Sequence, residues 1–182
     1  MQTKQQLFSF VVAVLFFLTV NHAHAQSPVK FGIGIEGGIP TGSASDAYSV
    51  LAGINLNVRA PLPVTGLEII GSAGYQQWSV KKSAKEELAS IGLVANNYGI
   101  LPIKVGARYG IGSSPFYIKF DLGPAITVKE VLEGAKSGTS MSYSPGLGTK
   151  LGPFDVELKY DIFSKSGESA SFFGLKLAYY FN

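Results

Sequence analysis

Apolar and polar residues alternate with a period of two in eight stretches of the chain, and turn-rich segments separate these stretches. Such alternation places successive side chains on opposite faces of a β-strand. Each stretch is close to the roughly 9–11 residues that a tilted strand needs to cross a membrane. The stretches cover residues 30–39, 48–59, 66–78, 97–109, 115–128, 140–151, 154–163 and 170–181. The pattern therefore predicts an all-β chain of eight antiparallel strands.

The connections between the predicted strands differ in length in a regular way. Short turns rich in Gly and Pro follow the second, fourth and sixth strands, the last of them being the Gly152-Pro153 pair. Long segments at 79–96 and 129–139 follow the third and fifth strands, and the first contains KSAKEELASIG, which predicts a short helix. Short turns on one side and longer loops on the other are typical of bacterial outer-membrane barrels. We expect an up-and-down transmembrane barrel with both termini and the short turns in the periplasm.

One face of the predicted strands collects thirteen charged side chains, seven basic and six acidic. They are Glu36, Arg59, Glu68, Lys104, Arg108, Lys119, Asp121, Lys150, Asp155, Glu157, Lys159, Asp161 and Lys176. The opposite face carries large apolar side chains and no charge in any of the eight stretches. An eight-stranded barrel has an interior that side chains fill. We expect the charges to form a balanced ion network in the lumen and the apolar face to lie against lipid.

The opposite orientation is the main structural alternative. In a soluble lipocalin-like barrel, the apolar face would line a ligand cavity and the charges would face water. Aromatic residues near the strand ends favour the membrane arrangement, because they are expected to form girdles at the two membrane interfaces. These aromatic residues are Phe31, Tyr48, Tyr75, Trp78, Tyr98, Tyr109, Phe116, Phe154, Phe163, Tyr179 and Phe181.

A few residues do not fit the strand pattern. Pro102, Pro124 and Pro145 fall inside predicted strands, although proline is usually confined to edges, strand ends and bulges. Ile70 lies on the polar face. We expect bulges near these positions.

The N-terminus reads as a secretory signal peptide. Lys4 is the only charge in the first 25 residues, and the apolar run LFSFVVAVLFFLTV occupies residues 7–20. Ala23 and Ala25 then form an A-x-A cleavage site. The run of 14 is too short for a transmembrane helix, which needs about 20 residues. We predict a signal peptide over 1–25, cleavage after Ala25, and a single barrel domain over 26–182.

Composition restricts the possible chemistry. Without Lys4, 14 of the 15 basic residues remain against 12 acidic ones, so the mature net charge of +2 gives no reason to expect a nucleic-acid partner. The chain has no cysteine, and both histidines, His22 and His24, lie in the predicted signal peptide. A His-based triad, a zinc site of His or Cys ligands and a haem held by His are thereby excluded. We expect no catalytic residue, no metal site and no cofactor.

The chain resembles the small outer-membrane β-barrel proteins of Bacteroidetes-type bacteria, the PorT-like group, within the class of eight-stranded outer-membrane barrels. The likeness rests on the run YGILPIKVGARY from Tyr98 to Tyr109 and on the closing strand GLKLAYYFN. The resemblance implies that the outer-membrane insertion machinery recognises the C-terminal strand. That signal usually ends on an aromatic residue, whereas here Asn182 follows Phe181. The family has no shared catalytic residues to transfer.

Four functions remain open on these grounds. The first is a monomeric, non-enzymatic barrel in the outer membrane whose loops 79–96 and 129–139 contact an external partner, because function concentrates on loops held by a rigid scaffold. The second is an outer-membrane enzyme, which without His would need a Ser–Lys or paired-Asp arrangement that no motif indicates. The third is a pore, which the charged lumen would obstruct. The fourth is the soluble barrel that binds an apolar ligand.

Overall fold

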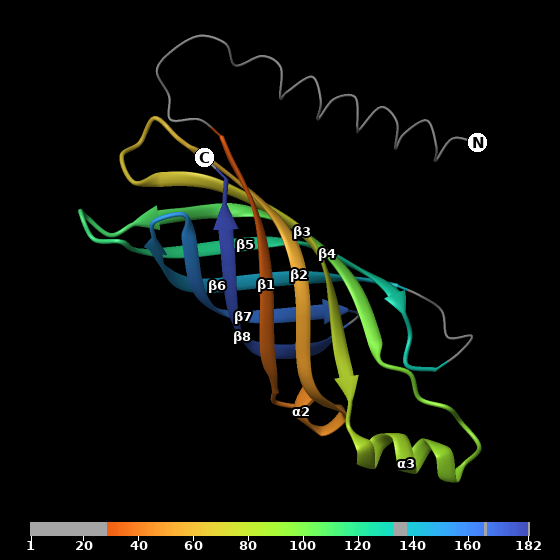
Figure 1. Cartoon of the computed structure of the whole chain (residues 1–182). Coiled ribbons are helices and arrows are strands. Elements are labelled where there is room, and N and C mark those ends of the chain that lie inside the picture. Colours follow the sequence, from red (N-terminus) through yellow and green to blue (C-terminus); the bar gives the residue numbers. More distant parts are fainter. Residues whose placement is uncertain (1–28, 133–137, 166, 182) are drawn as a thin grey trace, which may run out of the picture.

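The computed structural model describes residues 29–132, 138–165 and 167–181. Its strands form one closed antiparallel barrel in which every strand pairs with its sequence neighbours and β1 pairs with β8 (Figure 1). The strands are β1 (Lys30–Thr41), β2 (Tyr48–Pro61), β3 (Leu67–Val80), β4 (Tyr98–Gly110), β5 (Phe116–Lys129), β6 (Thr139–Leu151), β7 (Phe154–Lys165) and β8 (Glu168–Tyr180). All eight predicted strands and the up-and-down order are confirmed, with ends that differ from the prediction by two residues or fewer. The predicted signal peptide and its cleavage after Ala25 lie outside the described residues.

Short turns and long connections lie at opposite ends of the barrel. The short turns follow β2, β4 and β6 at one end, where the chain also leaves β8 (Figure 1). Gly152 makes the tightest of them possible, because its φ of +64° lies in the left-handed region that other residues avoid. At the same end, the Phe181 amide donates a hydrogen bond of 2.8 Å to the Phe31 carbonyl. We call this the short-turn end and the opposite one the loop end.

Two helices belong to the loop end. The predicted helix after β3 is confirmed as α3 (Lys82–Ser90), which extends away from the barrel wall (Figure 1). The sequence pattern missed α2 (Ala44–Ala47), a single turn between β1 and β2. The two long loops touch beyond the rim, where the Asn96 amide donates to the Val131 carbonyl at 2.8 Å. No helix in the described part of the chain is long and apolar enough to cross a lipid bilayer.

The three prolines inside strands interrupt the ladders without causing bulges, so our expectation of bulges at these sites is wrong. Next to Pro102, the β3–β4 ladder skips two residue pairs, and the pairing on either side keeps the same register. The β4–β5 ladder skips pairs in the same way near Pro124, and the β6–β7 ladder near Pro145. A proline lacks the N–H of one ladder bond, and the flanking bonds hold the register. The register shifts occur instead between Tyr48 and Val50 and between Gly99 and Ile100.

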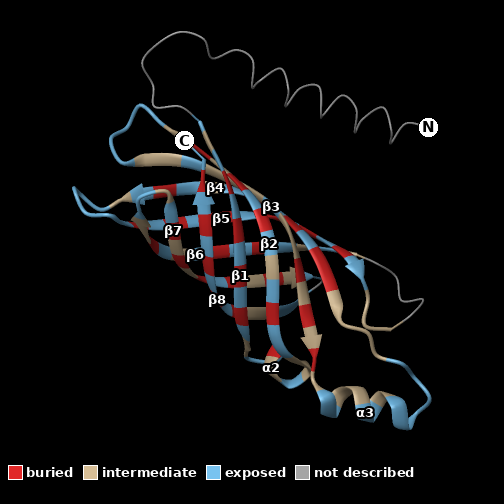
Figure 2. Cartoon of the chain, in the orientation of Figure 1, coloured by how far each residue is buried: buried red, intermediate tan, exposed pale blue. Residues whose placement is uncertain are grey.

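The barrel is polar inside and apolar outside. In β5, Phe116, Ile118 and Phe120 are exposed, whereas the alternating Lys119 and Asp121 are buried. The same alternation of exposed and buried residues repeats along most strands (Figure 2). Since the buried face of a strand points into a closed barrel, the charged residues lie in the lumen. The large apolar side chains cover the outer wall.

Candidate functional site

Eight charged residues in the middle of the lumen form what we call the central ion cluster. It contains as many carboxylates as lysines. Its members are Glu36, Lys104, Lys119, Asp121, Glu157, Lys159, Asp161 and Lys176. All of them are buried, each with an exposed fraction of 8% or less. Buried charges are tolerated when each one is paired, and here each has at least one partner of opposite sign.

Lys159 is at the centre of one half of the central ion cluster, and Lys104 links this half to Asp121 of the other at 4.0 Å. Its Nζ lies 2.5 Å from Oε2 of Glu36 on β1 and 2.8 Å from Oδ2 of Asp161 on its own strand. The other oxygen of Asp161 accepts from Nζ of Lys104 at 2.8 Å, across the barrel from β4. Ser144 bonds the same oxygen and accepts a 2.6 Å hydrogen bond from Lys104. Four strands are thereby tied through the lumen.

Lys119 and Glu157 form the other half of the central ion cluster. Nζ of Lys119 lies 2.7 Å from Oε1 of Glu157 and 2.6 Å from Oδ2 of Asp121. Nζ of Lys176 lies 3.7 Å from the second oxygen of Glu157 and donates to Oδ1 of Asn57 at 3.0 Å. Polar side chains thus complete the coordination of charges that the ion pairs leave unsatisfied.

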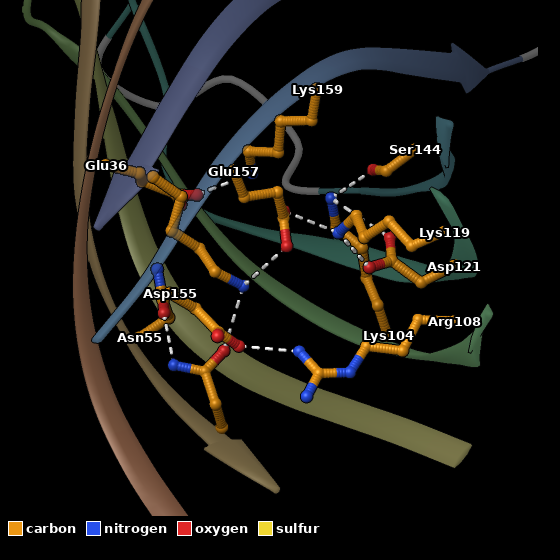
Figure 3. A network of polar contacts seen from close by, with 12 residues as sticks. Glu36, Asn55, Lys104, Arg108, Lys119, Asp121, Ser144, Asp155, Glu157 and Lys159 are labelled. Atoms are coloured by element: carbon orange, nitrogen blue, oxygen red, sulfur yellow. Dashed lines mark hydrogen bonds and ion pairs between the residues drawn. The ribbon is translucent and has the colours of Figure 1, made fainter. Parts of the chain in front are cut away.

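A second group, the lower ion cluster, lies toward the short-turn end. It consists of Arg59, Glu68, Arg108, Lys150 and Asp155. Oδ2 of Asp155 accepts from Nη1 of Arg59 at 3.1 Å and from Nη1 of Arg108 at 2.5 Å (Figure 3). Nε of Arg108 pairs with Glu68, whose carboxylate lies 3.5 Å from Nζ of Lys150. This cluster has one more basic group than acidic groups.

Two tyrosines hold the arginines of the lower ion cluster in place. The Arg59 guanidinium lies 4.0 Å from the ring centroid of Tyr180, and that of Arg108 lies 4.6 Å from the ring centroid of Tyr117. A cation over an aromatic face is attracted by the ring quadrupole, more strongly when both are shielded from water. The sequence pattern places both tyrosines on the polar face but gives no sign of these contacts.

The structure brings all thirteen predicted lumen residues into these two clusters. Eleven of them are buried. Glu68 and Lys150 are the two that are not, with side chains that are 19% and 39% exposed. Both lie near the short-turn end, where β3 begins and β6 ends.

Side chains fill most of the lumen. The cavities found among the charges include two of about 10 Å³ each. One is lined by Arg108, Lys176 and Tyr180 among others, and the other by Glu36 and Lys104 among others. Each has room for about one water molecule.

Beyond the central ion cluster, aromatic side chains close the loop end of the lumen. We call Tyr48, Trp78, Tyr98, Phe163 and Phe172 the aromatic plug. The ring centroid of Trp78 lies 4.3 Å from that of Phe172, 4.9 Å from that of Phe163 and 5.1 Å from that of Tyr98. Aliphatic side chains complete the cluster, and Trp78 is only 3% exposed. The barrel therefore has a mostly apolar core at this end.

The aromatic plug corrects the prediction of two outer girdles. Tyr48, Trp78, Tyr98 and Phe163 were expected on the outer wall, but they face inward. Strict alternation predicts the inward orientation of three of them. Trp78, Tyr98 and Phe163 are each an even number of residues away from a lumen residue on the same strand. These lumen residues are Gln76, Lys104 and Asp161, respectively. Tyr48 enters the lumen because the register of β2 shifts between Tyr48 and Val50.

A single outer girdle remains, at the short-turn end. The rings of Phe154, Tyr179 and Phe181 form a chain of edge contacts, with centroids 5.2 Å and 5.4 Å apart. Phe31 and Phe116 lie at the same end and are more than half exposed. This girdle follows the prediction for one of the two interfaces.

Solved structures with the same fold include small barrels of bacterial outer membranes. The crystal structure of Ail, the attachment invasion locus protein of Yersinia pestis, has a TM-score of 0.55 at 18% identity, covering 86% of this chain and all of Ail. The N-terminal β-barrel domain of Pseudomonas aeruginosa OprF has a TM-score of 0.57 at 12% identity, covering 84% of this chain and 97% of that domain. Ail in a phospholipid bilayer nanodisc aligns with a TM-score of 0.53 at 15% identity, covering 85% of this chain and all of that chain. No protein-family model matches the chain, and no curated protein matches it in sequence.

Proposed function

We propose that the chain is a non-enzymatic outer-membrane β-barrel with a closed lumen. The observation that carries the proposal is the inverted polarity of the fold. Large apolar side chains such as Ile33, Leu56 and Ile118 are at least half exposed on the outer wall, while charged side chains are buried inside. In water such a wall would be a large aggregation-prone patch, whereas in a bilayer it is the favourable surface. The fold shared with Ail and OprF supports the same assignment.

The soluble lipocalin-like alternative requires the opposite arrangement. Its apolar face would line a cavity, but here the inward-facing positions in the middle of the barrel carry lysines and carboxylates. The cavities among them have room for about one water molecule each. Charged walls and cavities of this size are unfavourable for an apolar ligand, which supports the membrane barrel over the soluble one.

Membrane extraction tests the proposal directly. We expect the chain to sediment with membranes, to be released by detergent and to migrate faster on a denaturing gel without boiling than after boiling. A closed barrel resists unfolding by detergent at low temperature and remains compact. Recovery of the unboiled chain in the soluble fraction of detergent-free extracts would contradict membrane insertion.

The closed lumen makes a second expectation measurable. The ion clusters and the aromatic plug fill successive layers of the interior, so the purified chain should give no conductance of the size of a general porin in planar bilayers. A known porin reconstituted in the same bilayers is the positive control. Stable large-conductance steps from the wild-type chain would show that the layers open.

We further propose that the long loops at the loop end carry the external contact. The α3 segment and residues 91–94 that follow it extend beyond the rim (Figure 2). Ile91 and Val94 are 69% and 76% exposed. Exposed apolar residues on a water-facing loop indicate a contact surface. One protein of the same fold is named an attachment invasion locus protein, which agrees with an adhesive role.

Loop exchange tests this part of the proposal. Tight turns in place of residues 82–96 and 131–137 should leave heat-modifiable migration intact, because the ladder pairs of β3, β4, β5 and β6 lie outside these ranges. Attachment of cells to a coated surface should fall to the level of a strain that lacks the chain. A loop-exchanged barrel that is folded and attaches as well as wild type would contradict the loop-contact role.

The remaining details of the proposal concern export and assembly. We propose that the chain is exported by its predicted signal peptide with cleavage near Ala25, reaches the outer membrane as a monomer, and belongs to the PorT-like group of barrels. The C-terminal segment supports recognition by the insertion machinery, because the outward residues of β8 are apolar from Phe173 to Tyr179 and the exposed Phe181 follows the strand. N-terminal sequencing of the membrane-inserted protein tests the cleavage position.

A further inference from the structure

The outer wall carries an apolar groove over β1, β2, β7 and β8. Its volume is about 660 Å³, and its lining includes Ile35, Ile39, Phe173 and Leu175. Gly37 opens the groove, because its missing side chain leaves a space in which an added Cβ would meet only the Leu51 carbonyl, at 3.8 Å. The groove extends along the strands from the level of Ile35 to that of Ile39, about 13 Å at roughly 3.3 Å per residue.

Three hydroxyl groups lie at the end of this groove that faces the loops. Oγ1 of Thr41 lies 3.1 Å from the hydroxyl of Tyr160 and 2.9 Å from Oγ of Ser171, and Tyr160 donates to Ser171 at 2.9 Å. We call Thr41, Tyr160 and Ser171 the hydroxyl trio.

The hydroxyl trio lies on β1, β7 and β8, and on each of these strands it continues the line of the groove. Thr41 comes two residues after Ile39 on β1, and Ser171 comes two residues before Phe173 on antiparallel β8. Tyr160 likewise follows the groove residue Leu158 on β7. Since side chains two apart in a strand point to the same face, the trio and the groove form one continuous outer surface. The surface is apolar along its length and polar at one end.

The hydrogen bonds within the hydroxyl trio leave acceptors free. Each hydroxyl has one proton and two lone pairs. Every proton of the trio has an acceptor within the trio or at the Thr41 carbonyl, which Ser171 approaches at 3.5 Å. The trio has six lone pairs and only three protons, so at least three lone pairs stay unused whichever way the hydroxyls donate. Such a site is complementary to a group that donates hydrogen bonds.

We propose that this surface binds one bilayer lipid, with an acyl chain in the groove and a hydrogen-bond-donating headgroup at the hydroxyl trio. The inference rests on the proposed membrane insertion, since only then does the outer wall meet lipid. Phosphatidylethanolamine, whose ammonium group donates hydrogen bonds, fits the site. Phosphatidylcholine has the same acyl chains and phosphate but no N–H donor, so it fits only the groove.

Native mass spectrometry of the full-length folded chain, incubated in detergent with equal amounts of these two lipids, tests the proposal. The wild-type chain should retain phosphatidylethanolamine over phosphatidylcholine by roughly three- to tenfold, the effect of about one hydrogen bond. A triple variant, Thr41→Val with Tyr160→Phe and Ser171→Ala, should retain both lipids equally. Gly37→Ile fills the groove and should lower the retention of both.

Tyr143 provides a matched control. It is an outward tyrosine on β6 with the same exposed fraction as Tyr160, 37%, and it lies outside the groove. Tyr143→Phe should leave the lipid preference unchanged. Two results would overturn the lipid site. One is equal retention of the two lipids by the wild type, and the other is that the single variants Tyr143→Phe and Tyr160→Phe lose the lipid preference to the same extent. If the chain inserts into membranes but shows no lipid preference, only the lipid site is wrong. If the chain never inserts, the proposed function is wrong.

Discussion

Replacing Lys159 with methionine is expected to destabilise the barrel by about 3–5 kcal/mol, the usual cost of breaking a buried ion pair by removing one partner. The change leaves Glu36 and Asp161 buried at 8% and 1% exposure without the cation between them. Asp161 retains Lys104 at 2.8 Å, whereas Glu36 retains only the 2.7 Å hydrogen bond from Gln76. Urea unfolding of the reconstituted chain, followed by the fluorescence of its one tryptophan, Trp78, measures the loss.

Two further variants show whether the loss comes from the unpaired charge. Lys150→Met removes a lysine whose side chain is 39% exposed and should cost at most about 1 kcal/mol. Adding Glu36→Gln to Lys159→Met removes the stranded carboxylate and should recover part of the stability. If Lys159→Met unfolds at the same urea concentration as wild type, Lys159 does not belong to a buried network.

Truncating the centre of the aromatic plug has an effect of similar size. Trp78→Ala is expected to cost about 3–5 kcal/mol, since it removes a buried ring and leaves a cavity that its neighbours only partly fill. Trp78 contacts four other rings, including Phe172 at 4.3 Å, and no backbone rearrangement can replace these contacts. Because the variant lacks the fluorescent residue, the temperature at which the compact gel band disappears is the measurement.

A conservative variant shows whether the loss of stability comes from the missing ring. Trp78→Phe keeps a ring in the same place and should lose much less stability than Trp78→Ala. Val64→Ala changes a residue in a short turn that is 57% exposed and should stay within about 0.5 kcal/mol of wild type. A gel transition of Trp78→Ala at the wild-type temperature would mean that the plug does not contribute to stability.

The sequence predicted the strands well because a membrane barrel repeats one rule along its whole wall. Alternation determines strand direction, face and approximate length, as in β7, where Asp155 through Asp161 alternate with apolar residues. The turns were recognisable because they need residues such as Gly152. α2 was missed because a single helical turn such as Ala44–Ala47 is too short to produce a periodic pattern.

The pairing inside the lumen could not be predicted from the sequence. Which acid meets Lys104 depends on barrel curvature and on the distance across it, and its partner Asp161 lies 57 residues away on a strand that is not adjacent. The aromatic plug was misplaced for a different reason. Aromatic residues at strand ends suit both a membrane interface and a dry lumen, so composition alone could not decide between the two sides of the wall.

The seam between β1 and β8 sets a condition on how the barrel assembles. It joins residues 32–41 to residues 171–180, so the closing contacts span almost the whole sequence of the barrel. Contacts of such high contact order form slowly, because the loop entropy must be lost before the pairing energy is gained. Until β8 arrives, the edges of β1 and β7 stay unpaired and open to other chains. The nascent chain therefore depends on protection from aggregation until its last strand is in place.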